Sequence, residues 1–408
     1  MKILQIHNLY RQAGGEDVVA EQEAKLLMEN GHQVDRWIRD NKKELKSPLA
    51  RLRLPFTTHF SSRSLQMARQ RLRKGRHDLM HVHNFFPLFT PSIFRAARQM
   101  GVPSVMTLHN YRLIHPNGQL YTDGEIDERS VGGSAWRCVP DGVYRGSILQ
   151  TAVVARMIEY HRKQGTWDHV PSLFITLTRF AREKLAEGGL PADRMVVKPN
   201  FIEDPGQDYA DTRVKSESES VVLSGRFLFV GRISEEKGVE DLIRAWISQG
   251  IHEELRIAGD GPEKERLQSL SDGTSNIRWL GRLDRDEVRR EMAMATALVL
   301  PSRWYEGFPM TLVEAFSVGC PAIVTGIGSQ AEIVIHEQNG FHVTPGDDAG
   351  LAYAVRRMAG EHSLVRRFSE NARAVYRTRY TPEVNYRLMM EIHQQAVEME
   401  KRLAGDGQ

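Results

Sequence analysis

Short apolar runs alternate with helical patterns along most of this chain. Ile3–His7 reads as a buried strand, residues 16–30 carry apolar side chains at helical spacing, and Gln33–Ile38 begins the next strand. The same alternation resumes at Phe227–Val230 and continues to about residue 380. Strands that alternate with helices are typical of parallel sheets covered by helices, so the pattern predicts an α/β fold.

The length of the chain and a polar stretch near its middle indicate two domains. The 408 residues are 41% hydrophobic and 26% charged, an ordinary globular composition with more chain than a single core usually holds. Residues 204–220 are mostly polar, as in an exposed linker. We therefore expect one α/β domain on each side of this linker.

The apolar run Ala297–Leu300 leads into a loop and then a helix, and two glutamates flank the start of that helix. Pro309 suits a first helical position because its missing N–H would have no partner there, so we expect the helix from Met310. Glu306 precedes the helix, and Glu314 lies about one turn inside it. Unpaired N–H groups and the positive end of the helix dipole make such a terminus a site for an anionic ligand. The simpler alternative is that Glu314 only complements the dipole.

The chemistry of this loop suits a sugar nucleotide. Carboxylates accept hydrogen bonds from hydroxyl groups strongly, so one glutamate can hold sugar hydroxyls and the other a ribose diol. Gly307 lets the backbone approach a ligand closely.

A pair of cations follows the apolar run Phe227–Val230. Gly231 comes directly after this run, and Arg232 and Lys237 lie five residues apart before the next helical pattern. Two fixed cations can clamp a diphosphate and balance the charge that grows on a departing nucleotide. Solvated surface cations are the alternative.

These two segments resemble the signatures of the family 4 glycosyltransferases, which are retaining enzymes of GT-B architecture that use nucleotide sugars. The matching motifs are E-G-F-P-x4-E at Glu306–Glu314 and G-R-x4-K-G at Gly231–Gly238, with a weaker match at Gly14-Gly15-Glu16. The resemblance covers nearly the whole chain. It implies two Rossmann-like domains facing across a cleft, the acceptor-side domain at 1–203 and the nucleotide-sugar-binding domain at 221–380. It also implies that the terminal helix, about 381–408, packs back on the first domain.

The resemblance assigns roles to individual residues. Arg232 and Lys237 stabilise the leaving diphosphate, Glu306 orients the sugar, and His109, after the expected strand Pro103–Leu108, lines the reaction site. The donor contacts that it implies are Gly14, Gly15, Gly231, Arg232, Lys237, Gly259, Leu280, Gly281, Glu306, Gly307, Phe308, Met310 and Glu314. A structural role at a strand end is the alternative for His109, and a plain turn is the alternative for the Gly14-Gly15 pair.

The implied activity is retaining, metal-independent transfer of a sugar from a nucleoside diphosphate sugar to an acceptor hydroxyl. The expected acceptor is a sugar or a lipid-linked glycan in surface polysaccharide synthesis, and no cofactor is expected beside the donor itself. A sugar-nucleotide epimerase of the same architecture and a non-catalytic nucleotide-sugar-binding module are the alternatives.

Other ligand sites receive less support. Gly259-x-Gly261 lacks a third glycine, so a nicotinamide site is not expected. His81 and His83 alternate on an expected strand, but no carboxylate cluster follows them, so no metal site is expected there. Cys138 and Cys320 lie far apart without metal or redox spacing, which suggests reduced thiols in a cytosolic protein.

Positive charge gathers in the first half of the chain. The net charge is +3, but Lys42–Arg76 alone holds eleven basic residues and one acidic residue. Leu65, Ala68 and Leu72 fall on one side of a possible helix in this segment, and such a basic amphipathic helix suits an anionic bilayer surface. A solvated basic face and nucleic acid are the alternatives, and no known nucleic-acid motif accompanies the patch.

The sequence also allows expectations about the localisation of the protein and about its remaining loops. Met1 runs straight into a strand pattern and no apolar run reaches membrane-spanning length, so we expect a cytoplasmic protein, peripheral on the inner face of the cytoplasmic membrane. Residues 115–145 read as a long loop that helps to select the acceptor. We also expect a loop at Gly326–Ser329 and a turn at Asn339-Gly340.

Overall fold

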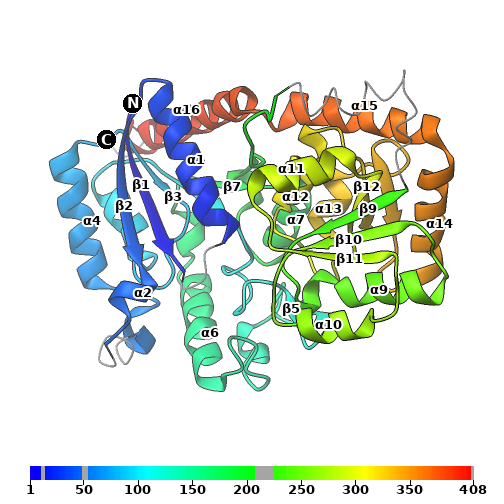
Figure 1. The fold of residues 1–408 in the computed structure, drawn as a ribbon. Coiled ribbons are helices and arrows are strands. Elements are labelled where there is room, and N and C mark those ends of the chain that lie inside the picture. Colours follow the sequence, from blue (N-terminus) through cyan, green and yellow to red (C-terminus); the bar gives the residue numbers. More distant parts are fainter. Residues whose placement is uncertain (11–13, 48–53, 207–224, 406–408) are drawn as a thin grey trace. The chain divides into compact units, whose positions relative to one another are not determined.

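The computed structural model describes residues 1–10, 14–47, 54–206 and 225–405, and the chain forms two compact units (Figure 1). The first unit comprises 1–120, 127–200 and 382–408; the second comprises 121–126 and 201–381. Most of the expected linker, and residues 48–53 of the basic segment, lie outside the described residues.

The first unit is built on a six-stranded parallel sheet of order β2-β1-β3-β4-β7-β8. Its strands are β1 (Lys2–Leu9), β2 (Gln33–Asp40), β3 (Leu79–Val82), β4 (Ser104–Leu108), β7 (Leu173–Thr176) and β8 (Met195–Val197). The inner strands β3, β4 and β7 are buried along their whole length, which explains their continuous apolar runs.

Helices complete the first unit. They are α1 (Gly15–Glu29), α2 (Asn41–Glu44), α4 (Ser62–Gly75), α5 (Ser92–Gln99), α6 (Ile148–Lys163), α7 (Arg179–Glu187) and α16 (Pro382–Gly405). The last of these comes from the end of the chain and packs against α1 and β4 (Figure 1). Leu65, Ala68 and Leu72 are the buried side of α4, as the periodicity predicts.

The second unit repeats the plan with the parallel order β11-β10-β9-β12-β13-β14. Figure 1 labels the first four strands of this order. Its strands are β9 (Arg226–Val230), β10 (Glu254–Ala258), β11 (Ile277–Gly281), β12 (Ala297–Leu300), β13 (Ala322–Thr325) and β14 (Gly340–Val343). Its helices are α9 (Val239–Ser248), α10 (Lys264–Leu270), α11 (Arg285–Met294), α12 (Met310–Ser317), α13 (Gly328–Ile333), α14 (Asp348–Gly360) and α15 (His362–Arg379). The two parallel α/β sheets confirm the predicted fold class.

One expectation about the end of this sheet was partly wrong. The expected loop at Gly326–Ser329 ends at residue 327, and residues 328–333 form the helix α13. The expected turn is present at Asn339, but the sequence did not reveal that residues 340–343 form the edge strand β14. Gly328, with φ of 61°, opens α13, and no side chain caps the helix, so the usual start signal is missing. The strand has only four residues and is too short for a periodic pattern.

The segment between β4 and α6 also holds structure that the sequence did not reveal. It contains the antiparallel hairpin β5 (Tyr121–Thr122) and β6 (Glu125–Ile126) and the 3-10 helix η1 (Ala135–Cys138). None of the described helices is both long and apolar enough to cross a membrane.

Candidate functional site

The second sheet places the predicted cations and glutamates at one point of its topology. The chain runs outward from β9 to β10 and β11, and then returns to the other side of β9 as β12. Ligands of open α/β sheets bind at the carboxyl ends of the strands where the order reverses in this way. The loop after β9 carries Arg232 and Lys237, and the loop after β12 carries Glu306.

Lys237 and Glu306 contact each other across this reversal point. Lys237 ends the 3-10 helix η5 (Glu235–Lys237), and its Nζ donates to Glu306 Oε1 at 2.7 Å. Gly238 comes next with φ of 68°, and a Cβ there would lie 2.0 Å from the carbonyl oxygen of Pro301. Only glycine therefore lets the loop after β9 pack so closely on the loop after β12.

Glu306 is held in place before any ligand arrives. The residue is 5% exposed, and its Oε1 also accepts a hydrogen bond from Ser302 Oγ at 2.8 Å. The Ser302 carbonyl in turn accepts from Thr325 Oγ1 of β13. Glu306 Oε2 has no hydrogen-bond partner among the described residues, so one oxygen remains for a ligand hydroxyl.

Arg232 differs from Lys237 in having no preset partner. Its side chain is exposed and makes neither an ion pair nor a hydrogen bond within the described parts of the chain. A free guanidinium and a fixed ammonium on the same loop can both serve a ligand with two phosphates.

Glu314 lies in the short helix α12, which starts at Met310 as predicted. Its carboxylate makes no hydrogen bond to the described residues. Burial raises the pKa of Glu314, and the positive charges of Arg285 and Arg289 on α11 oppose that rise. The carboxylate is therefore partly desolvated, and its oxygens can still accept hydrogen bonds from a ligand.

Several glycines of the second unit allow its backbone turns to pack closely. A Cβ on Gly259 would lie 1.8 Å from the carbonyl oxygen of Gly231, and Gly259 N donates to the carbonyl of Gly281 at 2.8 Å. The turns after β9, β10 and β11 therefore interlock through glycine. Leu280 packs on the hydrophobic core, and Phe308 lies against the Tyr380 ring at 6.0 Å. Their predicted donor contacts stay predictions.

The first unit presents its own candidate residues at the reversal point between β1 and β3. A cavity of about 20 Å³ there is lined by His109, His83, Asn84, Tyr10 and Arg112, among others. His109 Nε2 lies 3.2 Å from His83 Nδ1, and the two rings stack at 5.5 Å. Burial lowers the pKa of His109 to about 3, so this imidazole is neutral near pH 7.

The glycine pair Gly14-Gly15 is less open to a phosphate than its sequence suggests. Asp17 Oδ2 already accepts the Gly14 N–H at 3.0 Å, and the other oxygen of Asp17 lies 2.7 Å from His7 Nε2. A Cβ on Gly15 would meet nothing within 4 Å, so close packing does not demand glycine there.

Glu16, next to this pair, is a candidate that sequence reasoning missed. Its Oε1 accepts from Asn84 Nδ2 at 3.1 Å. Burial raises the pKa of Glu16 to about 8, the Asp17 carboxylate adds to the rise, and Arg112 opposes it. A carboxyl group that titrates near neutrality can take up or release a proton beside the cavity. Its position after Gly14-Gly15 was the only available signal.

A buried polar network lies behind His109 and was also missed. His83 Nε2 lies 3.6 Å from Glu23 Oε2, and Lys198 Nζ donates to Glu23 Oε1 at 2.6 Å. Lys198 also donates to Asn385 of α16 at 3.2 Å. Sequence analysis found no carboxylate for His81 and His83, but the fold brings Glu23 to them from α1. The Lys198 ammonium supplies the positive charge at this carboxylate.

Two family models match the chain. The glycosyl transferase 4-like domain matches residues 14–200, and the model of glycosyl transferases group 1 matches residues 215–375. The matched ranges include every candidate donor residue named from Gly14 to Glu314.

Relatives and solved structures agree with these matches. An exopolysaccharide phosphotransferase of Streptomyces coelicolor is 32% identical over 210 residues, 48% of this chain and 21% of that protein. A lipopolysaccharide core biosynthesis glycosyltransferase of Rhizobium meliloti is 26% identical over 231 residues, 56% of this chain and 65% of that protein. The structure of Anabaena HepE in complex with UDP and glucose has the same fold, with a TM-score of 0.64 at 18% identity over 96% of this chain and 98% of that chain. The chain spans between 21% and 45% of the length of the first curated relatives that it matches.

Proposed function

Because this chain belongs to the family 4 glycosyltransferases, we propose that it moves a sugar from a nucleoside diphosphate sugar to an acceptor hydroxyl. The observation that carries the proposal is the Lys237–Glu306 ion pair at the reversal point of the second sheet, between the loop after β9, which also carries Arg232, and the loop after β12. A diphosphate needs fixed cations and a sugar needs fixed hydrogen-bond acceptors. This loop pair offers both within one unit.

Each residue has a definite part in this proposal. Arg232 and Lys237 bind the diphosphate, and Glu314 accepts hydrogen bonds from the ribose diol. Glu306, with the N–H groups of Phe308 and Met310, orients the transferred sugar. Pro309 has no N–H and contributes only shape. His109, neutral at pH 7, lines the reaction site as a hydrogen-bonding group without charge.

The proposed reaction retains the anomeric configuration through attack on the same face of the sugar. The acceptor oxygen bonds to the anomeric carbon, the bond from that carbon to the diphosphate oxygen breaks, and the leaving phosphate takes the acceptor proton. Negative charge then grows on the diphosphate, and the two cations balance it. We therefore propose that the reaction needs neither a metal ion nor a cofactor.

Donor affinity is expected to fall as the pH drops toward the raised pKa of Glu314. The ionised carboxylate can accept both ribose hydroxyls, whereas the protonated group loses acceptor capacity, so binding favours the ionised form. Glu314→Gln should bind the donor more weakly and with little dependence on pH. Calorimetric titration with a nucleoside diphosphate sugar, from acidic to neutral pH, measures the donor affinity and its dependence on pH. An identical pH profile in the wild type and Glu314→Gln would contradict this role.

Two other functions predict different products. A sugar-nucleotide epimerase converts the donor without an acceptor, and a non-catalytic module binds the donor without consuming it. The intact set of Glu306, Glu314, Arg232 and Lys237 favours transfer over a decayed site. Product analysis with and without acceptor separates the three.

We propose surface polysaccharide assembly as the pathway and a sugar or lipid-linked glycan as the acceptor, supported by the similarity to the Streptomyces exopolysaccharide protein and the Rhizobium lipopolysaccharide core glycosyltransferase. Thermal-shift measurements with uridine, guanosine and adenosine diphosphate sugars test donor binding. A ligand at 100 times its Kd adds about 2.7 kcal/mol to the free energy of unfolding, so one base should stand out. No shift with any donor would contradict the proposal.

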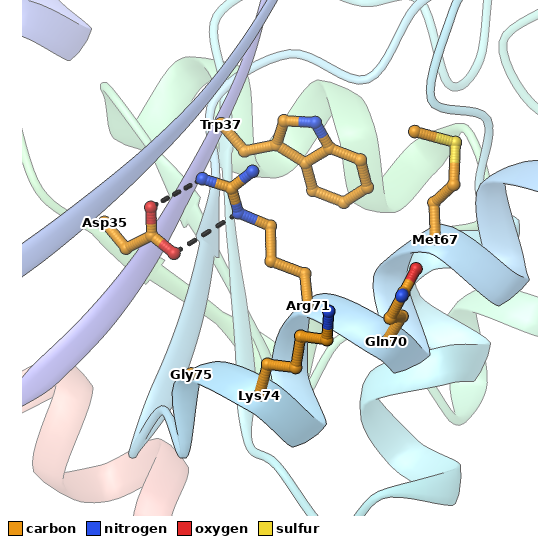
Figure 2. A pocket seen from close by; sticks show the side chains of 7 residues that line it. All are labelled: Asp35, Trp37, Met67, Gln70, Arg71, Lys74 and Gly75. Carbon is orange, nitrogen blue, oxygen red and sulfur yellow. Dashed lines mark hydrogen bonds and ion pairs between the residues drawn. The ribbon is translucent and has the colours of Figure 1, made fainter.

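We also propose that the solvent side of α4 meets an anionic membrane surface, which would make the protein cytoplasmic and peripheral. The basic residues of this face without a partner among those described are Arg63, Arg73, Lys74 and Arg76. Arg71 is not among them, because Asp35 of β2 pairs with its guanidinium at 2.6 Å under the Trp37 ring (Figure 2). This pair borders a surface hollow of about 420 Å³, toward which Lys74 and Met67 extend (Figure 2).

Liposome sedimentation tests the membrane contact. The protein is expected to sediment with anionic vesicles at low salt and to be released at high salt, because exposed charges are screened. Arg63→Glu with Arg73→Glu should abolish sedimentation, and Arg290→Glu, an exposed residue of α11, serves as the control. Failure of the wild type to bind anionic vesicles at low salt would dismiss this contact.

A further inference from the structure

The segment between β4 and α6 gathers three buried side chains with metal-binding atoms. His115 Nε2 lies 3.4 Å from Asp127 Oδ2 and 3.6 Å from Cys138 Sγ. The three residues lie before and after the β5–β6 hairpin and are buried. A histidine, a carboxylate and a thiol directed at one point are the ligand types that zinc prefers.

The hydrogen bonds around His115 direct a lone pair toward this point. Asn117 Oδ1 accepts the N–H of Gln119 at 2.8 Å, which identifies this atom as the amide oxygen. His115 Nδ1 lies 2.7 Å from the same oxygen and must therefore donate to it. In the neutral imidazole, Nε2 then has no proton and faces the carboxylate and the sulfur. Proteins commonly orient a metal-binding histidine through a hydrogen bond that its other ring nitrogen donates.

Ser130 adds an independent observation. Its side chain is completely buried, and its Oγ makes no hydrogen bond of normal geometry with the described residues. The hydroxyl lies near the Cys138 thiol and interacts with it. Because a thiol is a weak hydrogen-bonding partner, the buried Oγ keeps acceptor capacity that a cation at this point would use.

We propose that His115, Asp127 and Cys138 bind a structural zinc ion, with Ser130 Oγ in the fourth position. A tetrahedral zinc ion with bonds of about 2.0–2.3 Å separates nitrogen from oxygen by about 3.4 Å and nitrogen from sulfur by about 3.6 Å. The two separations from His115 Nε2, 3.4 Å and 3.6 Å, equal these values, and the three ligand atoms all lie within 4.8 Å of one another. The ion would join the chain before the hairpin to the chain after it.

Arg129 is compatible with the ion. Its guanidinium donates to Asp127 Oδ1 at 2.9 Å and to Asp127 Oδ2 at 2.8 Å. A carboxylate oxygen has two acceptor positions, so Oδ2 can serve both Arg129 and a metal. The pair fixes the direction of the carboxylate, as outer-shell partners of metal ligands do.

A catalytic cysteine is the competing interpretation, and the surroundings argue against it. Cys138 has no exposed surface, and burial with the nearby Asp127 carboxylate raises the pKa of its thiol to about 11. A reactive cysteine needs an accessible thiolate. The zinc ion proposed here is structural and takes no part in sugar transfer.

Elemental analysis of the full chain, purified without chelator from zinc-supplemented medium, tests the proposal. We expect about one zinc ion per chain in the wild type and in Cys320→Ala, which removes the other buried cysteine. Cys138→Ala should lose the zinc. Cobalt substitution of the wild type should show a thiolate-to-cobalt charge-transfer band, which disappears in Cys138→Ala and strengthens in Ser130→Cys.

Wild-type measurements keep the test independent of whether a variant folds. After removal of metal by a chelator, added zinc should raise the Tm of the wild type and added magnesium should not. A wild type that contains no zinc and whose Tm does not respond to it would overturn the proposal. The cluster would then be a structural contact of His115 with Asp127 beside a buried thiol.

Discussion

Replacing Arg232 and Lys237 together by alanine is expected to reduce turnover by about a hundredfold or more, the magnitude typical for loss of preorganised charge stabilisers. The leaving diphosphate gains negative charge as its bond to the sugar breaks, and these are the cations placed to balance it. Lys237→Ala also removes the partner of Glu306, which is only 5% exposed. Both the diphosphate and the sugar contacts are therefore affected.

Steady-state kinetics with a saturating acceptor measures this loss. The matched control, Lys264→Ala with Arg290→Ala, removes the same charges from α10 and α11 of the same unit and should retain turnover. Tm measurements show whether the Arg232 and Lys237 variant is folded. Wild-type turnover in that double variant would refute the clamp assignment.

Replacing Lys198 by methionine is expected to lower the free energy of unfolding by about 3–5 kcal/mol, the range for breaking a buried ion pair from one side. Lys198 and Glu23 both have fully buried side chains and lie 2.6 Å apart. The variant leaves the Glu23 carboxylate buried without its cation. Because His83 links Glu23 to His109, the loss reaches the candidate reaction site as well.

The double variant Glu23→Gln with Lys198→Met distinguishes this cause from a loss of packing. It leaves no buried charge and should be more stable than Lys198→Met alone. Lys25→Met, which removes an exposed cation of α1, should change stability by less than about 1 kcal/mol. Urea unfolding monitored by hydrogen exchange measures the stability of the first unit separately from that of the second. Equal stability of Lys198→Met and the wild type would contradict the account.

Sequence patterns predicted most of the fold because each inner strand is a continuous apolar run and most helices have a regular apolar face. β12, for example, is buried at every residue, and its run Ala297–Leu300 is apparent in the sequence. The pattern was insufficient at β14 and α13, which are short and lack capping signals. Their structure depends on pairing with β13 and packing in the sheet, which local sequence does not encode.

The sequence predicted which residues belong to the candidate site, but not which of them contact one another. The motifs identified Lys237 and Glu306, whereas their ion pair depends on Gly238 packing against Pro301. Contacts between distant segments were missed altogether, because no local periodicity relates Glu23 to Lys198 or His115 to Cys138. The raised pKa of Glu16 is likewise a consequence of burial in the folded chain.

Arg232, Lys237 and Glu306 are proposed to form a site that uses a nucleoside diphosphate sugar as donor. Time-resolved proton NMR of the donor that gives the largest thermal shift, incubated with the protein and a glycan acceptor, follows the reaction itself. We expect release of the nucleoside diphosphate together with a product of unchanged anomeric configuration. A donor that binds but stays intact, or that is converted to another sugar nucleotide without any acceptor, would contradict this proposal.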